Sequence, residues 1–420
     1  MLLAQLFRTI IQCGELTVID GNGRTLRYGD PGSGPRVTIR LHDRRLYWRL
    51  PLNPRLAVGE AYVDGTLTVE DGTIYDFLDL MGLNLGNQRI NAWERWSAHA
   101  AMLWRGVQQA NPLGTAQKRI AHHYDMAGEL YEWTLDSDMQ YSCAYFPTLG
   151  VSLEEAQEAK MRHIAAKLCL EPGQKVLDIG SGWGGMALYL ARNADVEVTG
   201  VTLSTEQHKL SRKRVQEAGL ANRVGLHLRD YREETGIYDR IVSVGMFEHV
   251  GVPHYQEYFD KLAGLLRDDG VALLHTIADR GMPAATNPWM RKYIFPGGHC
   301  PSLSEILPAI ERAGLWVTDI EILRLHYAET LRHWRERFMA NRQRAIELYG
   351  GRFCRMWEFY LASSEMAFRR MGMMVAQIQL TKSVEAAPLT RDYMAQWEQA
   401  HAPADAAPAA DLGRRLKSVG

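Results

Sequence analysis

The sequence predicts an α/β protein with a Rossmann-like, doubly wound parallel sheet and a smaller α+β domain at its N-terminal end. Three observations predict the sheet. Residues 175–179 form a short apolar run typical of a buried parallel strand, and a glycine turn and a helical pattern follow it. A second strand pattern follows at 196–202. Further strand patterns at 224–228, 239–244 and 271–277 alternate with helical ones, as a doubly wound sheet requires.

The glycine turn after the first strand predicts a site for a nucleotide-type ligand. Residues 175–185 read KVLDIGSGWGG, and glycines let the backbone turn tightly and let a ligand approach the main chain. The spacing G-x-G-x-G-G differs from the G-x-G-x-x-G of dinucleotide dehydrogenases. The second strand ends in Thr202-Leu203 without the acid that would hold a nicotinamide ribose. Both departures favour S-adenosylmethionine over a nicotinamide cofactor.

Residues just after each strand are candidate ligand contacts, because ligands bind at the carboxyl ends of the strands in such sheets. Gln207 has two interpretations of equal weight, since Ser204 and Gln207 also fit a helix N-cap pair. Asp230 and Tyr231, after the third strand, offer a carboxylate and an aromatic face that could frame an adenine. The candidate contacts are Asp178, Gly180, Gly182, Gly184, Thr202, Leu203, Gln207, Asp230 and Tyr231.

Composition sets broad limits on the protein class. The net charge of −1 gives no reason to expect a nucleic-acid partner. The five cysteines are scattered without a C-x-x-C pair, so we expect neither a metal site nor a disulfide framework, and the reducing cytoplasm is the simplest location. No apolar run approaches the ~18 residues of a membrane span, so we expect any membrane contact to be peripheral.

The chain of 420 residues is predicted to contain three segments. Residues 1–115 would form an N-terminal α+β domain associated with lipid or membrane, with an amphipathic helix at 2–12 and β-hairpins between 14 and 49. That first helix either touches a membrane or, as is commoner, packs on its own domain. Residues 116–387 would form the catalytic domain. The Ala/Pro-rich stretch 388–420 lacks apolar content and is predicted to be disordered.

Several segments, in order, resemble the cyclopropane-fatty-acyl-phospholipid synthase family. They are VLDIGSGWGG, GVTLSTEQ, DYR, YDRIVSVGMFEHVG, LLHTI and KYIFPGG, with YSCAYF upstream and HYAETL downstream. The resemblance covers about residues 55–380, and GMFEHVG followed by LLHTI is its most specific part. It implies a class I S-adenosylmethionine-dependent methyltransferase with an all-helical insertion that forms a lipid pocket. It also implies Tyr141 and Ser142 as further S-adenosylmethionine contacts.

The reaction implied by the resemblance is methylene transfer from S-adenosylmethionine to the cis double bond of an unsaturated acyl chain in a membrane phospholipid. An alkene is a weak nucleophile, so the donor must be a strong electrophile, and a base must then remove a proton so that the ring closes. The family uses a bound bicarbonate for this purpose. Glu248 and His275 would orient the ion and take up its proton. The full set of holders, carried over from the family, is Cys143, Glu248, His275, Ile277 and Tyr327.

Each of these residues also has an ordinary structural explanation. His275 alone would be a core residue, Glu248 a first-turn acid of a helix, and Cys143 a small buried hydrophobe. Their joint occurrence at the ends of the predicted strands favours function. Two positions depart from the family: Ser181 replaces a cysteine in the glycine turn, and Ser364 stands at a cysteine often assigned to the active site. Because serine without a basic partner is a poor nucleophile, we expect that thiol to be dispensable.

The predicted partner is an unsaturated membrane phospholipid. Residues 282–360 are rich in aromatics and could supply an apolar slot that caps the site and excludes water, which would quench a cation. Arginines between 36 and 55 could attract anionic headgroups. The expected location is peripheral, at the inner face of the cell membrane, and the resemblance implies a homodimer.

Beside the synthase, two alternatives stay open. A sister enzyme could share the first step and form a methyl- or methylene-branched chain, as a fatty-acyl C-methyltransferase. A catalytically silent regulator could bind lipid or S-adenosylmethionine. A nucleic-acid methyltransferase is disfavoured by the net charge and by the absence of an N/D-P-P-Y motif.

Overall fold

The structure, a computed structural model, describes residues 2–85, 128–148 and 150–403. These residues belong to two compact units, which are not contiguous in sequence. The first contains residues 2–85, 279–300 and 327–374, and the second contains the remaining described residues. Residues 279–300 and 327–374, which the sequence analysis assigned to the catalytic domain, thus cluster with the N-terminal residues. The boundary predicted at residue 115 lies outside the described residues.

The first unit contains a four-stranded sheet in the order β2-β1-β3-β4. β1 and β2 form the predicted hairpin, whereas β3 runs parallel to β1 and pairs antiparallel with β4. Side chains alternate between buried and partly exposed along β1, so one face of the strand supplies the core. The strands are β1 (Gly14–Ile19), β2 (Thr25–Asp30), β3 (Arg36–Leu41) and β4 (Leu67–Asp71).

Helices from distant parts of the chain complete the first unit. In α1, Leu3 and Phe7 are buried, so this helix packs on its own domain. α16 packs against α3 and α4, and a Cβ at Gly59 in α3 would collide with Trp289 and Phe359. This close packing explains why the late helices cluster with the N-terminal residues. The helices are α1 (Leu2–Ile10), α2 (Leu46–Leu52), α3 (Pro54–Val63), α4 (Ile74–Leu85), α12 (Pro288–Tyr293), α14 (His326–Ala340), α15 (Arg342–Tyr349) and α16 (Gly351–Arg370).

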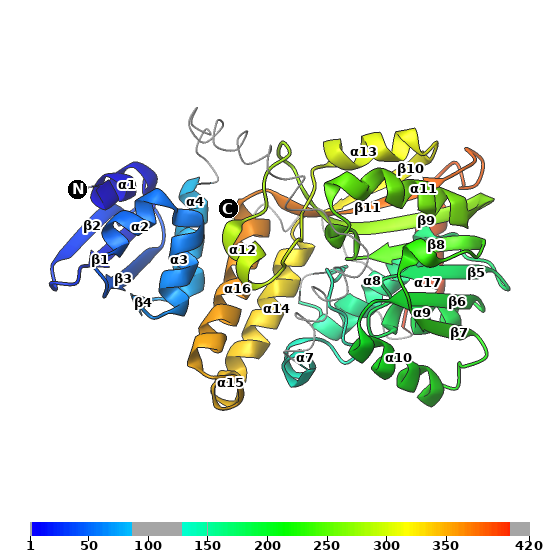
Figure 1. Ribbon diagram of the computed structural model, residues 1–420, viewed down its shortest axis with the longest axis horizontal. Helices are drawn as coiled ribbons and strands as arrows, with labels where there is room; N and C mark the ends of the chain where they lie inside the picture. The colour runs from blue at the N-terminus through cyan, green and yellow to red at the C-terminus, as the bar shows by residue number, and fades with distance from the viewer. Residues whose placement is uncertain (1, 86–127, 149, 404–420) are drawn as a thin grey trace. The chain divides into compact units, whose positions relative to one another are not determined.

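The second unit contains a seven-stranded sheet in the order β10-β11-β9-β8-β5-β6-β7 (Figure 1). All five predicted strands are present and pair in parallel, while β10 and β11 pair antiparallel. β10 lies within residues 282–360, so that insertion is not entirely helical. The strands are β5 (Lys175–Ile179), β6 (Glu197–Thr202), β7 (Val224–Leu228), β8 (Tyr238–Val244), β9 (Leu266–Asp279), β10 (Trp316–Leu323) and β11 (Met373–Thr381).

The switch point of this sheet lies at β5. The chain leaves β5 for β6 and β7 on one side and returns to β8 and β9 on the other. Connections therefore diverge at the carboxyl ends of β5 and β8, which is where ligands bind in such sheets. The first predicted ligand-binding turn follows β5 directly.

Helices cover the second sheet. α8 starts with a capping box in which Ser152 and Glu155 bond reciprocally, and its apolar face joins a core with α9 and strands β5 to β7. Among the described residues, no helix is both long enough and apolar enough to cross a bilayer. The helices are α7 (Gly128–Thr134), α8 (Leu153–Lys167), α9 (Gly185–Asn193), α10 (Thr205–Glu217), α11 (Tyr255–Leu265), α13 (Leu303–Arg312) and α17 (Asp392–Ala400).

The prediction of disorder from residue 388 is wrong for residues 392–400. They form α17, in which Met394 is buried and Trp397 packs against the α8–α9 core. Glu398 also bonds to His163 on α8 at 2.6 Å. These side chains precede the segment AHAPADAAPAADLG at 400–413, and they supply the apolar surface that this segment lacks. Residues 404–420 lie outside the described residues.

Replacing Met394 by alanine should lower the free energy of unfolding by about 2 kcal/mol, because the change leaves a cavity beneath α17. Gln396→Ala, on the exposed face of the same helix, is the control and should change it by less than about 0.5 kcal/mol. Urea unfolding of the full chain measures both. Equal effects of the two variants would show that α17 does not pack as described.

Candidate active site

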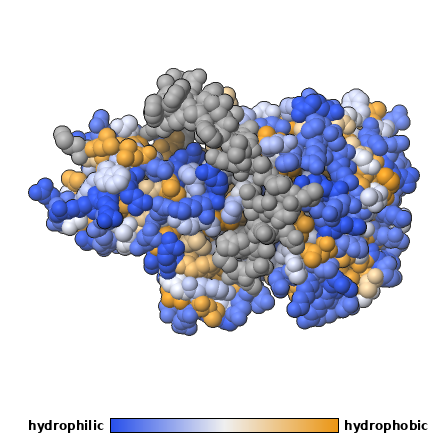
Figure 2. All heavy atoms as spheres, in the orientation of Figure 1, coloured by the Kyte–Doolittle hydropathy of each residue, from blue (hydrophilic) through white to orange (hydrophobic). Residues whose placement is uncertain are grey.

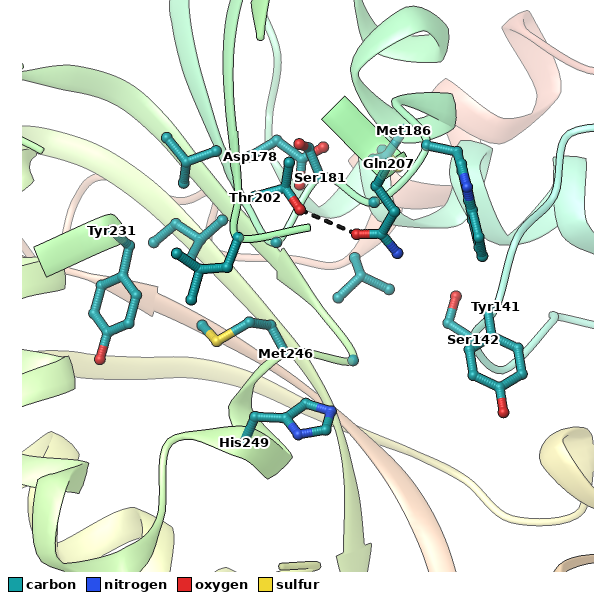
Figure 3. Close-up of a pocket in the computed structure, with 18 of the residues that line it drawn as sticks. Tyr141, Ser142, Asp178, Ser181, Met186, Thr202, Gln207, Tyr231, Met246 and His249 are labelled. Atoms are coloured by element: carbon teal, nitrogen blue, oxygen red, sulfur yellow. Dashed lines mark hydrogen bonds between the residues drawn. The ribbon is translucent and has the colours of Figure 1, made fainter. Parts of the chain in front are cut away.

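A pocket opens at the carboxyl ends of β5, β6, β7 and β8 (Figure 3). Gly184 was predicted to contact the ligand, but it does not line the pocket. It is the N-cap of α9 with a φ of 82°, so its role is to start the helix. The other predicted contacts all line the pocket: Tyr141, Ser142, Asp178, Gly180, Gly182, Thr202, Leu203, Gln207, Asp230 and Tyr231.

The glycine turn brings main chain to the pocket wall. Gly180 has a φ of 84°, which favours glycine, and a Cβ there would also meet the Met246 side chain at 2.8 Å. The backbone N–H groups of Gly180 and Ser181 both donate to the Val201 carbonyl, at 2.9 and 3.0 Å. These two bonds fix the turn against β6. Gly185 matters for a different reason, because a Cβ there would collide with Asp138 and Gln140.

Gln207 takes part in the helix cap and also lines the pocket, so the structure is compatible with both roles left open by the sequence. Its backbone N–H donates to the Ser204 hydroxyl at 3.3 Å, so Ser204 caps α10. Its side-chain oxygen accepts a hydrogen bond from Thr202 Oγ1 at 3.0 Å. Figure 3 shows the Gln207 amide directed into the pocket beside Thr202. In the cap, the Ser204 hydroxyl accepts from the Gln207 backbone N–H, so the Gln207 side chain is available for a ligand.

The end of β7 contributes a carboxylate that is already paired. Asp230 accepts two hydrogen bonds from the Arg232 guanidinium, at 2.9 and 2.7 Å. Tyr231 packs edge-on against Tyr258 with ring centroids 5.4 Å apart. Tyr231 and Tyr141 lie on opposite sides of the pocket in Figure 3, so aromatic faces are present at both ends.

A buried lysine stands behind the pocket and was missed by the sequence reasoning. Lys160 on α8 donates to Gln140 Oε1, and to Ser142 Oγ at 3.0 Å. Burial lowers the pKa of Lys160 to about 8. Burial likewise raises the pKa of the pocket residue Asp178 to about 7, although the Lys160 charge opposes that shift. A lysine in a helical pattern normally indicates a solvent-facing side, so no sequence signal marked it.

Other pocket residues were also missed. His249 is one of them, and it follows Glu248 in the segment after β8. Burial alone lowers the pKa of His249 to about 4, so this ring is neutral at physiological pH. The position of the GMFEHVG segment could have identified it. Other lining residues that the sequence analysis did not single out as ligand contacts include Asp138, Met139, Gln140, Trp183, Met186, Arg229, Arg232, Met246 and His254.

His249 should make the stability depend on pH. Its pKa is about 4 in the folded chain and about 6.5 when unfolded, so the unfolded state binds more protons between these values. Stability conferred by the neutral ring is present above about pH 6.5 and is lost as the pH falls toward about 4. Relative to His249→Gln, which lacks this titration, the wild type should lose about 2 kcal/mol between pH 7 and pH 5. Urea unfolding at both pH values measures this difference, and parallel pH profiles would contradict it.

Glu248 and Ile277, two of the predicted catalytic residues, are in direct contact. Glu248 Oε1 accepts a hydrogen bond from the Ile277 backbone N–H at 2.6 Å. Glu248 Oε2 is buried and has no hydrogen-bond partner among the described residues. Because the side chain is buried, the pKa of Glu248 is raised. The site therefore holds a carboxyl group whose ionised form is disfavoured by burial and which has one oxygen available.

His275 and Cys143 are also buried in the second unit. His275 stands two residues before Ile277 on β9, so both occupy the same face of the strand. Its Nδ1 lies 3.1 Å from Gln377 Nε2, and burial lowers the pKa of the imidazole well below its usual value. The Cys143 thiol lies 3.3 Å from the Ala144 carbonyl.

Tyr327 and Ser364 belong to the first unit, not to the unit that holds Glu248 and His275. Tyr327 on α14 packs edge-on against Trp334, with ring centroids 5.9 Å apart, and against Phe368 at 4.8 Å. Ser364 is buried within α16. The predicted catalytic set is thus divided between the two units.

Comparison with known proteins decides the family. Residues 113–378 match the family model described as mycolic acid cyclopropane synthetase. The chain belongs to this family. It is therefore an S-adenosylmethionine-dependent methyltransferase, and the family membership and the class I fold predicted from the sequence are confirmed.

Individual relatives cover most of the chain. The cyclopropane-fatty-acyl-phospholipid synthase of Escherichia coli strain K12 is 37% identical over 354 residues, which are 84% of this chain and 90% of that protein. A probable fatty acid methyltransferase of Pseudomonas putida is also 37% identical, over 84% of this chain and 89% of its own. A crystal structure of mycolic acid cyclopropane synthase CmaA1 with SAH and CTAB has a TM-score of 0.60 and 32% identity. It covers 64% of this chain and 99% of that one.

Proposed function

We propose that this enzyme is a cyclopropane-fatty-acyl-phospholipid synthase that acts on unsaturated acyl chains of membrane phospholipids. The similarity to the Escherichia coli synthase over most of both chains supports this substrate class. The observation that carries the proposal is the buried Glu248 carboxyl, whose Oε1 is fixed by Ile277 and whose Oε2 is left without a partner among the described residues. A buried oxygen of this kind marks a place for a further group.

We assign the pocket at β5 to S-adenosylmethionine. Its wall offers backbone at Gly180 and Gly182, the Gln207 amide and the Ser142 hydroxyl. The paired Asp230 and the flanking tyrosines suit the ribose and adenine of such a ligand. When bound, S-adenosylmethionine supplies the electrophilic methyl that an alkene needs. Lys160, by holding Gln140 and Ser142, keeps one side of this pocket in place.

The residues around Glu248 fit bicarbonate. Burial raises the pKa of Glu248, and when protonated this carboxyl can donate from Oε2 to an anion; a neutral imidazole at His275 can donate as well. Neutral donors suit an anion in a buried place, because an ionised Glu248 carboxylate would repel it. Cys143 and Ile277, which belong to the same unit as Glu248 and His275, complete the proposed holders. When bound, bicarbonate supplies a weak base for the proton that ring closure releases.

The overall change adds CH2 to the alkene: a methyl is gained and one proton is lost. Glu248 would act as a proton relay: its carboxyl releases the proton that it holds before it takes up another, and burial, which raises its pKa, favours the form that holds a proton. Burial of Glu248 and His275 excludes bulk water from the place where a carbocation would otherwise be quenched. Neither residue needs to act as a nucleophile, so the serine at position 364 is compatible with the reaction.

Replacing Glu248 by glutamine should leave S-adenosylmethionine affinity within about twofold and reduce turnover by roughly 10² to 10⁴-fold, the range of general acid–base catalysis. The amide can keep the bond to Ile277 and donate to an anion, but it cannot pass on a proton. Calorimetry measures ligand binding, and mass spectrometry of treated unsaturated phospholipid vesicles measures product. Near wild-type product formation would refute the role of Glu248. Product formation by the wild type that does not depend on added bicarbonate would refute the role of the anion.

A fatty-acyl C-methyltransferase is the second candidate, because the Pseudomonas putida relative of that description is as similar as the synthase. The product separates the two. Cyclopropanation adds the mass of CH2 and removes the double bond, whereas a methylene-branched chain of the same mass keeps an unsaturation. Proton NMR of the extracted acyl chains distinguishes them directly.

We also propose that α2 contacts the membrane surface. Trp48 and Leu52 are 56% and 70% exposed, one turn apart, while Leu46 and Leu50 of the same helix are buried. Arg45 is exposed one turn before Trp48. An aromatic ring, a leucine and a cation on one face are typical of a helix at a lipid interface. Figure 2 shows hydrophobic residues among hydrophilic ones on the surface of this N-terminal part.

The double change Trp48→Ala and Leu52→Ala should weaken binding to anionic phospholipid vesicles by about tenfold, since two apolar anchors are lost. Trp316→Ala is the matched control, because Trp316 is 54% exposed on β10 in the other unit. Vesicle sedimentation measures the bound fraction. Equal loss in both variants would place the membrane contact elsewhere.

A further inference from the structure

A chain of hydrogen bonds extends from His275 away from Glu248 through the second unit. His275 Nδ1 faces the Nε2 of Gln377 on β11 at 3.1 Å. The Oε1 of Gln377 lies 2.6 Å from the ammonium of Lys167 on α8. Lys167 also donates to Glu321 on β10. Gln377 and Lys167 are each 1% exposed, so bulk water does not compete for these bonds.

The direction of this chain follows from chemistry. An ammonium only donates hydrogen bonds, so Lys167 must face the oxygen of the Gln377 amide. The amide then has only its NH2 group to present to His275. Because an NH2 group donates, His275 Nδ1 must accept and carries no proton. The orientation of the amide is thus set by the lysine rather than by a choice between two equivalent placements.

The His275 ring is also kept neutral. Burial lowers its pKa, and the positive charges of Lys160, Lys167 and His163 lower it further. A neutral imidazole whose Nδ1 is unprotonated carries its single proton on Nε2. Among the described residues, the His275 ring forms its hydrogen bond through Nδ1. The Nε2–H group is therefore available to the site.

Lys167 is itself fixed by its hydrogen bond to Glu321. Glu321, which accepts from Lys167, also lies 2.6 Å from His163 Nε2, and His163 Nδ1 lies 2.6 Å from Glu398 on α17. His163 and Lys167 hold the pKa of Glu321 well below its usual value. The Glu321 carboxylate is therefore charged and balances the Lys167 ammonium. The orientation of the Gln377 amide therefore depends on side chains from four elements: α8, β10, β11 and α17.

We propose that Gln377, oriented by Lys167, is a positioning residue that fixes His275 as the Nε2–H tautomer, so that His275 donates a hydrogen bond to the anion and does not take up a proton. This inference rests on the proposed role of His275 beside the anion. It changes the expectation drawn from the sequence, in which Glu248 and His275 shared the proton. His275 orients the anion, and Glu248 alone moves the proton.

The test uses the full-length protein labelled with ¹⁵N in histidine, because protonated and unprotonated ring nitrogens have widely different ¹⁵N shifts. The His275 signals are assigned as those missing from His275→Asn. In the wild type we expect one protonated nitrogen, Nε2, and one unprotonated nitrogen, Nδ1. A protonated Nδ1 in the wild type would overturn the proposal.

Gln377→Glu is the decisive variant because it keeps the shape of the side chain. A carboxylate can still pair with Lys167, but it offers only acceptors to His275, so Nδ1 should become protonated. Turnover should fall on the order of 100-fold, with the KM for S-adenosylmethionine within about twofold, as for other residues that set a catalytic histidine tautomer. An unchanged His275 spectrum in this variant would overturn the proposal.

Gln379→Glu is the matched control. Gln379 lies two residues further along β11 and is also 1% exposed. It bonds to Tyr393, to Thr318 and to the backbone carbonyl of Lys167, but not to His275. It places an equal buried charge on the same strand and should leave the His275 spectrum as in the wild type. If Gln377→Glu does not fold, Lys167→Met supplies the test: without the ammonium, the amide can turn and the His275 signals should divide between both tautomers.

The outcome can be separated from that of the proposed function. If His275 is the Nε2–H tautomer but turnover does not depend on bicarbonate, the proposed role of the anion is refuted and the tautomer assignment remains intact. A bicarbonate-dependent enzyme with Nδ1 protonated would refute the positioning role of Gln377 alone.

Discussion

The pairing of β5 with both β6 and β8 is the constraint on which the site depends. It places the ends of four parallel strands at one edge of the sheet and opens a space where the connections diverge. The glycine turn after β5 is tied to β6 by two hydrogen bonds to Val201, so the position of its backbone follows from strand pairing alone. If a strand shifted by one residue in this register, each of its side chains would move to the opposite face of the sheet, and those that line the pocket would point away from it.

Burial of ionisable groups gives this edge its chemistry. Lys160, Asp178, Glu248 and His275 are buried and His249 is partly buried, and the pKa of each is shifted in the direction that favours the neutral form. Neighbouring groups can fix the direction of buried neutral donors and acceptors. Charged groups in water are not fixed in this way. The network that includes Gln377 applies the same principle over a longer distance, because a single lysine orients the amide that faces His275.

Sequence reasoning was strong where periodicity and glycine chemistry dominate. The five parallel strands, the turn at Gly180 and the pocket residues Thr202 and Gln207 could be predicted because strand ends and turns have local signatures. The late helices could not be assigned to the N-terminal unit, since the packing of Trp289 and Phe359 on Gly59 is a contact between residues far apart in sequence. Lys160 and Gln377 were missed for the same reason. Each looks like an ordinary surface residue of its helix or strand until partners from other elements surround it.

The distribution of the chain between its two units has a mechanical consequence. Among the described residues, the backbone passes from one unit to the other after residues 278, 300, 326 and 374. Each of these crossings is a covalent tether between the two units. A protease that cut one tether would leave the two units attached by the others, so the nicked protein would still run as one particle under native conditions.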